Sequence, residues 1–488
     1  MALINVTNLT FAYEGSYDNI FENVSFQIDT DWRLGFVGRN GRGKTTFLNL
    51  LMGKYSHQGS ISRPVSFEYF PYEVQDKTLD AIDIAYVIEP ELQMWQLLRE
   101  LNRLDVAEEA LYRPFATLSN GEQTKLLLAL LFLKENSFLL IDEPTNHLDA
   151  DARELVGDYL NTKKGFILVS HDRAFLDRCI DHVLSINKAD IEVQRGNFSS
   201  WHNNKTMRDN FERQENDRLR KDIARLHQAV RQTGEWSDKI ESSKIGNHAG
   251  DRGHIGHMAA KMMKRSKAIE KRQLDAIDQK STLLKNVERV DSLKLHPLEY
   301  HTQRLVSLDG VTISYGEKTA CENIRFEIMQ GERIALRGKN GSGKSSILKL
   351  ITGENKNYSG SLSIGSGLKI SYVPQDATFL TGNLSEYAAD RNIDETLFKA
   401  ILRKMEFSRT QFDKDMQNFS AGQKKKVLLA GSLCESAHIY IWDEPLNYID
   451  VFSRIQVEEL LADCSSTILF VEHDSAFTEK IATQVVEL

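Results

Sequence analysis

The chain has 488 residues, of which 41% are hydrophobic and 27% are charged, and its formal net charge is −8. These values are ordinary for a globular protein of two or three domains and do not by themselves suggest a nucleic-acid partner. The longest apolar run, residues 126–133, is far shorter than the ~20 residues of a membrane helix, and the first residues lack the pattern of a secretory signal. Four scattered cysteines form no C-x-x-C pair, so we expect a reduced, cytoplasmic protein.

A glycine-rich loop follows an apolar run that ends at Val37, and a helix is expected to open near Thr45. In such a loop the backbone N–H groups and the helix N-terminus face phosphate oxygens, the lysine reaches the β- and γ-phosphates, and the hydroxyl ligates Mg²⁺. A chance glycine-rich turn is the alternative for one copy. The candidate nucleotide-binding residues are Gly38, Arg39, Asn40, Gly41, Arg42, Gly43, Lys44, Thr45 and Thr46.

The same loop recurs about three hundred residues later, again after an apolar run, and this repetition excludes chance. Its candidate residues are Gly338, Lys339, Asn340, Gly341, Ser342, Gly343, Lys344, Ser345 and Ser346. Three further segments are duplicated at an offset of 300 to 302 residues: Leu118–Glu122 with Phe419–Gln423, Phe138–Glu143 with Ile439–Glu444, and Ser170–Asp172 with Glu472–Asp474. A tandem duplication in which strands alternate with helices predicts an α/β fold with a largely parallel sheet in each copy.

The order of these segments resembles the ATP-binding cassette, and the run Asp142–Asp149 in a fused pair resembles the ABC-F subfamily. The signature around Asn120, the run 422–427 and the segment Asp443–Asp450 are similar to the antibiotic-resistance members of the Lsa type. The resemblance implies two tandem ABC-type ATPase domains (P-loop NTPase) joined by an α-helical hairpin linker. The expected domains are residues 1–202, 203–300 (with a tip at about 239–267) and 301–488.

The linker differs in charge from the two cassettes. Residues 203–300 contain 21 Lys and Arg against 15 Asp and Glu, a balance of +6. Two apolar stripes have helical spacing: Leu219, Ile223, Leu226 and Val230, then Leu274, Ile277, Leu284 and Val287. We therefore expect an antiparallel helical hairpin with an irregular basic tip, whose first helix would span roughly 46 Å if it covers 203–233.

Two carboxylates end an apolar strand in each half. Asp142 and Asp443 suit Mg²⁺ binding beside Thr45 and Ser345, and Glu143 and Glu444 are candidates for activating the attacking water. A single such pair could be a solvated strand end, but both pairs follow a phosphate loop. The resemblance makes His171 and His473 the residues that contact the γ-phosphate and the water.

Several other residues receive roles from the resemblance. Tyr13 and Tyr315 would stack on adenine, although ordinary strand packing is the alternative. Ser119 and Gly121 would complete the site of Lys344, and Ser420 and Gly422 that of Lys44, so that two ATP molecules hold the halves together. Gln375 would help to place Mg²⁺ and water.

The two sites are expected to differ in two respects. The first half has Tyr72, which carries no amide, at the position of Gln375 in the second half. The second half has Leu446 and Tyr448 at the positions of Thr145 and His147 in the first half. We expect both to bind ATP with Mg²⁺ and to hydrolyse it at unequal rates.

The linker favours an RNA partner. Lys261, Lys264, Arg265 and Lys267 would lie close together on a helix, in a segment similar to the tRNA-contacting connector of ABC-F proteins. A solvated basic helix face is the alternative. The resemblance implies a cytoplasmic, monomeric ATP hydrolase with paired cassettes. Its partners would be the large ribosomal subunit (23S rRNA) and P-site tRNA, not DNA or a membrane.

The function expected from this resemblance is ribosome protection. In the ATP state the protein would enter the tRNA exit site, reach the peptidyl-transferase centre and displace lincosamide, pleuromutilin or streptogramin A antibiotics, and hydrolysis would release it. The alternatives are a housekeeping ABC-F translation factor that relieves stalled ribosomes and the ATPase subunit of an exporter.

Overall fold

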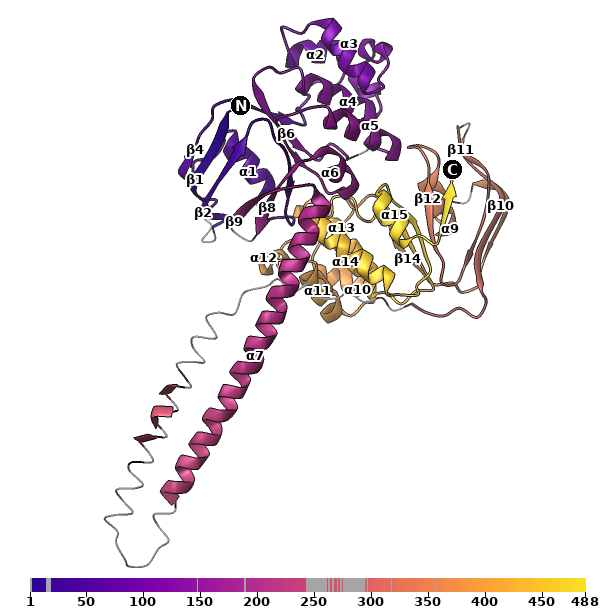
Figure 1. The fold of residues 1–488 in the computed structure, drawn as a ribbon. Coiled ribbons are helices and arrows are strands. Elements are labelled where there is room, and N and C mark those ends of the chain that lie inside the picture. Colours follow the sequence, from indigo (N-terminus) through magenta and orange to yellow (C-terminus); the bar gives the residue numbers. More distant parts are fainter. Residues whose placement is uncertain are drawn as a thin grey trace, which may run out of the picture. The chain divides into compact units, whose positions relative to one another are not determined.

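The computed structural model describes residues 2–14, 19–146, 148–187, 190–242, 261, 264–265, 267–269, 271–272, 274, 295, 297–316, 318–355 and 357–488, of which 231–242 as backbone only. The chain divides into two compact units (Figure 1). One consists of Met1–Trp201 with Val290–Leu488 and contains both cassettes, and the other is His202–Arg289.

The first cassette has a six-stranded sheet and a three-stranded sheet. The larger sheet has the order β5-β6-β7-β3-β8-β9 and is parallel except for β9 at its edge. The smaller one, β2-β1-β4, is antiparallel. The strands are β1 Leu3–Phe11, β2 Phe21–Asp29, β3 Arg33–Val37, β4 Gln58–Ile61, β5 Ser66–Phe70, β6 Ser137–Asp142, β7 Phe166–Val169, β8 His182–Asn187 and β9 Asp190–Arg195.

The second cassette repeats this plan, with a parallel sheet β14-β15-β16-β12-β17 and an antiparallel sheet β11-β10-β13. Its strands are β10 Arg304–Tyr315, β11 Lys318–Met329, β12 Arg333–Arg337, β13 Tyr358–Ile364, β14 Ile370–Val373, β15 Ile439–Asp443, β16 Ile468–Val471 and β17 Gln484–Glu487. The α/β fold with a largely parallel sheet in each copy is therefore confirmed. Because the strands that carry the predicted motifs run parallel, their carboxyl ends meet at one edge of each sheet.

The helices of the first cassette are α1 Lys44–Leu51, α2 Ala81–Ile88, α3 Met94–Arg103, α4 Asn120–Leu131, α5 Ala150–Asn161 and α6 Arg173–Cys179. Those of the second are α9 Lys344–Ile351, α10 Leu384–Asp390, α11 Glu395–Lys404, α12 Arg409–Phe412, α13 Ala421–Cys434, α14 Val451–Ala462 and α15 Ser475–Ile481. In each copy the first of these helices directly follows the phosphate loop.

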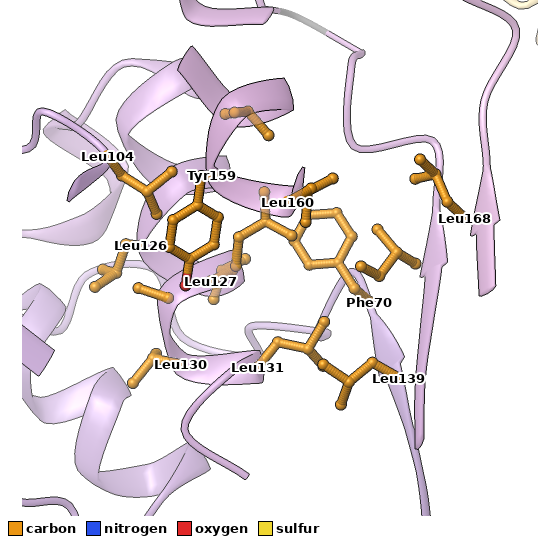
Figure 2. Close-up of a cluster of buried hydrophobic side chains, with 14 of the residues drawn as sticks. Phe70, Leu104, Leu126, Leu127, Leu130, Leu131, Leu139, Tyr159, Leu160 and Leu168 are labelled. Atoms are coloured by element: carbon orange, nitrogen blue, oxygen red, sulfur yellow. The ribbon is translucent and has the colours of Figure 1, made fainter. Parts of the chain in front are cut away.

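The apolar run 126–131 forms the inner part of α4 and is buried in the core of the first cassette. Figure 2 shows Leu127 and Leu131 of this helix facing Phe70, Leu139 and other apolar side chains of the sheet and of α5. Burial of the run in this core therefore explains why it is apolar. Among the described residues, no helix is both long enough and apolar enough to do so.

The second unit contains most of α7, Phe198–Ser242, a helix of 45 residues that covers the predicted first helix and extends beyond it. The four residues of the predicted apolar stripe from Leu219 to Val230 are partly buried. Most of the predicted tip, and all of the second stripe except Leu274, lie outside the described residues. Leu274 is exposed, and Lys261, Lys264, Arg265 and Lys267 are helical and exposed.

The compact second unit ends at Arg289, earlier than the expected linker boundary at residue 300. Residues that follow it pack on the second cassette: Leu295 is buried in that core, and Leu298 donates a backbone hydrogen bond of 2.8 Å to Ala437. The sequence between 290 and 300 carries no motif that would have placed this boundary.

Candidate nucleotide sites

Each phosphate loop joins the end of a parallel strand to a helix N-terminus. Gly41 and Gly43 in the first loop, and Gly341 and Gly343 in the second, have positive φ values between 81° and 93°. A Cβ atom at Gly43 would lie only 2.6 Å from Ile20, so this position also lacks space for a side chain. Glycine at these points lets the backbone curl around the helix end, as an anion-binding loop requires.

The loop lysines fold back over the loops. Lys44 Nζ donates to the Gly38 carbonyl at 2.7 Å, and Lys344 Nζ donates to the Gly338 carbonyl at 2.7 Å and to the Lys339 carbonyl at 2.9 Å. Burial lowers the pKa of both lysines. Each ammonium group therefore lies within the curl where the loop would hold phosphate oxygens.

In the first site the metal-binding candidates are in contact. The Thr45 hydroxyl donates to Asp142 Oδ2 at 3.2 Å, and the Tyr69 hydroxyl donates to the same oxygen at 3.0 Å. Burial raises the pKa of Asp142. Sequence reasoning missed Tyr69, although an aromatic residue with a hydroxyl on the strand beside Asp142 was a signal for it.

Glu143 follows Asp142 with a φ of 53°, a left-handed backbone conformation that is uncommon outside glycine. Its Oε1 lies 3.2 Å from His171 Nε2. Burial and the neighbouring Asp142 raise the pKa of Glu143 to about 8, and burial and Lys44 hold the pKa of His171 well below its usual value.

The second site has the same backbone but different electrostatics. Glu444 also has a left-handed φ, 47°, and its Oε1 lies 3.2 Å from His473 Nε2. Burial tends to raise the pKa of Glu444, but hydrogen bonds from His473 and Gln375 outweigh it and lower the pKa to about 2. The amide of Gln375, which was expected to help place Mg²⁺ and water, is therefore hydrogen-bonded to the candidate base Glu444.

Asp443 is buried at the end of β15 and accepts a hydrogen bond from Ser345. Its Oδ1 is buried without a hydrogen-bond partner. Burial raises the pKa of Asp443 to about 6. The Ser345 hydroxyl, the Asp443 carboxylate with its unsatisfied oxygen and the Gln375 amide form a set of oxygen donors that fits Mg²⁺. In proteins this ion is typically bound by one or two carboxylates together with phosphate and water.

Within the described residues, no cluster of three or more His, Cys, Asp and Glu side chains could hold a metal.

The signature of the first cassette lies at the phosphate loop of the second. One cavity of about 930 Å³ is lined by Ser119 and Gly121 together with Lys344, Glu444 and His473. Ser119 is the N-cap of α4 and forms a capping box with Glu122, and both residues line this cavity. Tyr315 and Gln375 line it as well.

At the first site the phosphate loop is in direct hydrogen-bonding contact with the second cassette. The Asn40 side-chain amide donates to the backbone carbonyl of Tyr448 at 2.8 Å. A Cβ atom at Gly422 would lie 2.4 Å from the Tyr448 carbonyl oxygen and 3.1 Å from Asn40 Nδ2, so only glycine fits there. Ser420 caps α13 beside it, as Ser119 caps α4.

Two arginines of the first loop point toward the other cassette. Arg39 lies 3.0 Å and Arg42 lies 3.6 Å from the carboxylate of Glu406, and the Arg39 guanidinium lies 5.2 Å from the ring centre of Phe452. Sequence reasoning placed both arginines in the nucleotide site but could not identify Glu406, which precedes α12 and belongs to no recognisable motif.

The two candidate base-stacking tyrosines hydrogen-bond to the helix after the loop. Tyr13 shares a hydrogen bond of 2.7 Å with Thr46, and the Tyr315 hydroxyl donates to Ser346 at 3.3 Å. Both rings are exposed, Tyr13 by 43% and Tyr315 by 49%. Tyr13 also contacts Phe11 and Tyr55 edge-on, so both stacking on a base and packing on the strand are compatible with its position.

The segments after the acidic pairs differ as their sequences do. The Thr145 hydroxyl shares a hydrogen bond of 3.3 Å with Ser170, whereas Leu446 is fully buried and its backbone N–H donates to Glu472 at 2.8 Å. His147 lies outside the described residues.

A family model described as "ABC transporter" matches residues 21–146 and 321–447. Ribosome protection protein VmlR of Bacillus subtilis (strain 168) is 26% identical over 493 residues, covering 98% of this chain and 85% of that protein. ATP-binding protein Uup of Caulobacter vibrioides is 26% identical over 494 residues, covering 96% and 74%.

Among solved structures, archaeal ribosome recycling factor aABCE1, in complex with the stalk protein aP1, superposes with a TM-score of 0.64 at 19% identity. The match covers 98% of this chain and 87% of that one. At this identity the likeness concerns the fold, and it extends over both cassettes.

Proposed function

Because the chain belongs to the ABC transporter family and is an ATP hydrolase, we propose that two ATP molecules close its cassettes on each other and that hydrolysis separates them. The observation that carries this proposal is the cavity shared by Ser119, Gly121 and Lys344. A nucleotide held by Lys344 there would contact the N-terminus of α4 from the other cassette, and such contacts exist only while the cassettes are closed.

Glu444 and His473 are the proposed catalytic pair of the second site. A carboxylate whose pKa is about 2 is ionised at neutral pH and can orient the attacking water by accepting a hydrogen bond from it. His473, 3.2 Å away, holds that carboxylate in place and is available to the γ-phosphate. Gln375 donates to the same carboxylate and restricts it further.

Mg²⁺ would be held by Asp443 and Ser345 in the second site and by Asp142 and Thr45 in the first. When bound, the ion neutralises charge on the phosphates. Lys344 and Lys44 would bind the phosphates. The adenine base would lie between Tyr315 or Tyr13 and the signature segment of the opposite cassette.

The two sites would hydrolyse ATP at different rates. Glu143 has a pKa raised to about 8, so much of it is protonated at neutral pH and cannot serve as a base. Tyr72, at the position of Gln375, offers no side-chain amide to Glu143, and its hydroxyl donates instead to Glu68 at 3.2 Å. The second site is therefore proposed to be the faster one.

The proposed target is the ribosome. Lys261, Lys264, Arg265 and Lys267 are helical residues that expose four positive charges, which suits the backbone of folded RNA. VmlR, a relative over most of its length, is named a ribosome protection protein. We propose that this chain, as a monomer, enters the exit site in its ATP state and contacts P-site tRNA and 23S rRNA.

The finer proposal is that the linker reaches the peptidyl-transferase centre and displaces lincosamide, pleuromutilin or streptogramin A antibiotics, as in the Lsa-type resistance proteins that the sequence resembles. A helix of 45 residues spans roughly 68 Å, which is long enough for such a reach. A housekeeping role is the second candidate, because Uup, named only as an ATP-binding protein, is as similar as VmlR.

A sedimentation experiment tests the ribosome-binding role. The double variant Glu143→Gln/Glu444→Gln, incubated with ribosomes and ATP, should remain bound because it closes without hydrolysing. The matched control adds Lys44→Ala and Lys344→Ala, which should abolish the retention. A catalytically inactive chain that sediments free of ribosomes would contradict the proposal.

Drug susceptibility separates resistance from housekeeping. Cells that produce the chain should tolerate a lincosamide or pleuromutilin better than cells that produce the Glu143→Gln/Glu444→Gln variant. Equal susceptibility, with ATP-dependent ribosome binding intact, would favour the housekeeping role.

A further inference from the structure

Asp142 and Asp443, the two carboxylates proposed to bind Mg²⁺, accept hydrogen bonds from different sets of hydroxyl groups. Asp142 Oδ2 accepts from Thr45 at 3.2 Å and from Tyr69 at 3.0 Å. Asp443 accepts from Ser345, the counterpart of Thr45. The extra donor at Asp142 comes from β5, the strand beside the one that ends at Asp142.

The second cassette has a tyrosine in the same register. Tyr69 pairs with Leu140, two residues before Asp142, and Tyr372 pairs with Ile441, two residues before Asp443. The Tyr372 hydroxyl nevertheless is buried without a hydrogen-bond partner. Tyr372 and Asp443 both line a cavity of about 590 Å³.

In the first cassette the position equivalent to Gln375 supplies no amide donor to the acidic pair. In the second cassette Gln375 donates to the acidic pair, through Glu444. Tyr72 occupies the equivalent position in the first, and its hydroxyl is committed to Glu68 at 3.2 Å.

We propose that Tyr69 is a positioning residue that orients Asp142 for Mg²⁺ in the first site, in the absence of an amide at position 72. The proposal rests on the metal-binding role proposed above for Asp142. A hydroxyl that donates to one lone pair of a carboxylate fixes its rotation and leaves the remaining lone pairs available to a cation. Tyr372 has no such role in the second site.

The surroundings of Tyr69 support this role. Its ring is partly buried against the apolar core of the first cassette, and Lys54 Nζ lies 5.8 Å from the ring centre, so the side chain is held from two sides. A tyrosine hydroxyl is protonated at neutral pH, so at 3.0 Å from Asp142 Oδ2 it donates to the carboxylate.

Manganese binding provides a test that does not depend on turnover. In the full-length Lys344→Ala variant, only the first site retains its phosphate lysine, and Mn²⁺ bound with ADP is measured by electron paramagnetic resonance. Adding Tyr69→Phe should weaken Mn²⁺ binding about 10-fold, the lower end of the effect seen when a partner of a metal ligand is removed. Binding of ADP in the presence of EDTA should be unchanged.

Matched variants separate positioning from a general structural effect. Tyr372→Phe in the same background should leave Mn²⁺ affinity unchanged. In the Lys44→Ala background, where the second site is tested, Tyr69→Phe should also have no effect. A loss of Mn²⁺ affinity in both backgrounds would show that Tyr69 acts on the fold and would overturn the proposal.

Asp142→Asn distinguishes this proposal from the function on which it rests. In the Lys344→Ala background it should weaken Mn²⁺ binding more than Tyr69→Phe does. If Asp142→Asn weakens Mn²⁺ binding and Tyr69→Phe does not, the role of Tyr69 is wrong while the metal site stands. If Asp142→Asn itself has no effect, the proposed metal site fails first, and the role of Tyr69 with it.

Discussion

The side-chain amide of Asn40, in the phosphate loop of the first cassette, donates a hydrogen bond of 2.8 Å to the backbone carbonyl of Tyr448 in the second. The bond joins residues 408 positions apart and lies beside Gly422, where a Cβ atom would not fit. It is thus a direct contact between one nucleotide loop and the segment that follows the opposite acidic pair.

Replacing Asn40 should weaken closure of the cassettes. A hydrogen bond of this kind contributes about 1 kcal/mol, so Asn40→Ala in the Glu143→Gln/Glu444→Gln background should weaken ATP-dependent retention on ribosomes roughly 5-fold. Asn8→Ala, a substitution on the small antiparallel sheet, is the control. Unchanged retention would mean that the Asn40–Tyr448 bond does not contribute to the closed form.

The pH dependence of hydrolysis should differ between the sites. With Glu444→Gln only the first site turns over, and because the pKa of Glu143 is raised to about 8, the fraction of ionised base grows as the pH increases through that value. The ATPase rate of this variant should therefore rise severalfold between about pH 7 and pH 9.

The opposite variant provides the comparison. With Glu143→Gln the second site remains, and Glu444, with a pKa of about 2, is already ionised, so its rate should be nearly constant over the same interval. Parallel pH profiles for the two variants, measured as phosphate release, would contradict the electrostatic difference described here.

A buried ion pair joins the two cassettes away from the nucleotides. Glu458 is completely buried, and it contacts both Arg173 and Lys480, the latter at 3.2 Å. Removing one partner of a buried pair leaves an uncompensated charge, which costs about 3–5 kcal/mol. Arg173→Ala should lower the thermal midpoint of the chain by several degrees, since Lys480 compensates only in part.

The double variant Arg173→Met/Glu458→Met should recover much of this loss, because two apolar side chains need no partner. Arg178→Ala, which removes a longer and more exposed pair with Glu154, should change the midpoint little. An Arg173→Ala midpoint equal to that of the parent would refute the importance of the pair.

The basic segment of the second unit should govern the salt dependence of ribosome binding. Alanine at Lys261, Lys264, Arg265 and Lys267 removes four charges and should reduce the slope of log affinity against log salt by about 3. The control removes Arg218, Arg220, Lys221 and Arg225, which are exposed on α7. Equal slopes for the parent and the first variant would favour a merely solvated helix face.

The duplicated motifs predicted the fold, and they supplied the candidate residues of both sites, because each motif is local: a strand, a few glycines and a helix start. The contacts that distinguish the sites are not local. Arg173 meets Glu458 across 285 residues, and their counterparts in the other copy are Ser475 and Gly157, so the duplication gives no signal for the pair.

Tyr69 was missed for a related reason. Both copies contain a tyrosine at this position, and only the structure shows that one reaches its aspartate while the other does not. Similarly, the sequence predicted Glu143 and Glu444 as candidate bases, but it did not predict their left-handed backbone, since glutamate has no preference for it.

The left-handed backbone at these two glutamates is expected to lower the stability of the fold. A glutamate in the left-handed region carries a conformational cost of roughly 1 kcal/mol, which a glycine at the same point would not have. In the proposed mechanism this backbone aims one carboxylate per cassette at the substrate, at some cost in resistance to denaturation. A chain with glycine at both points should be free of this backbone strain and inactive as an ATPase.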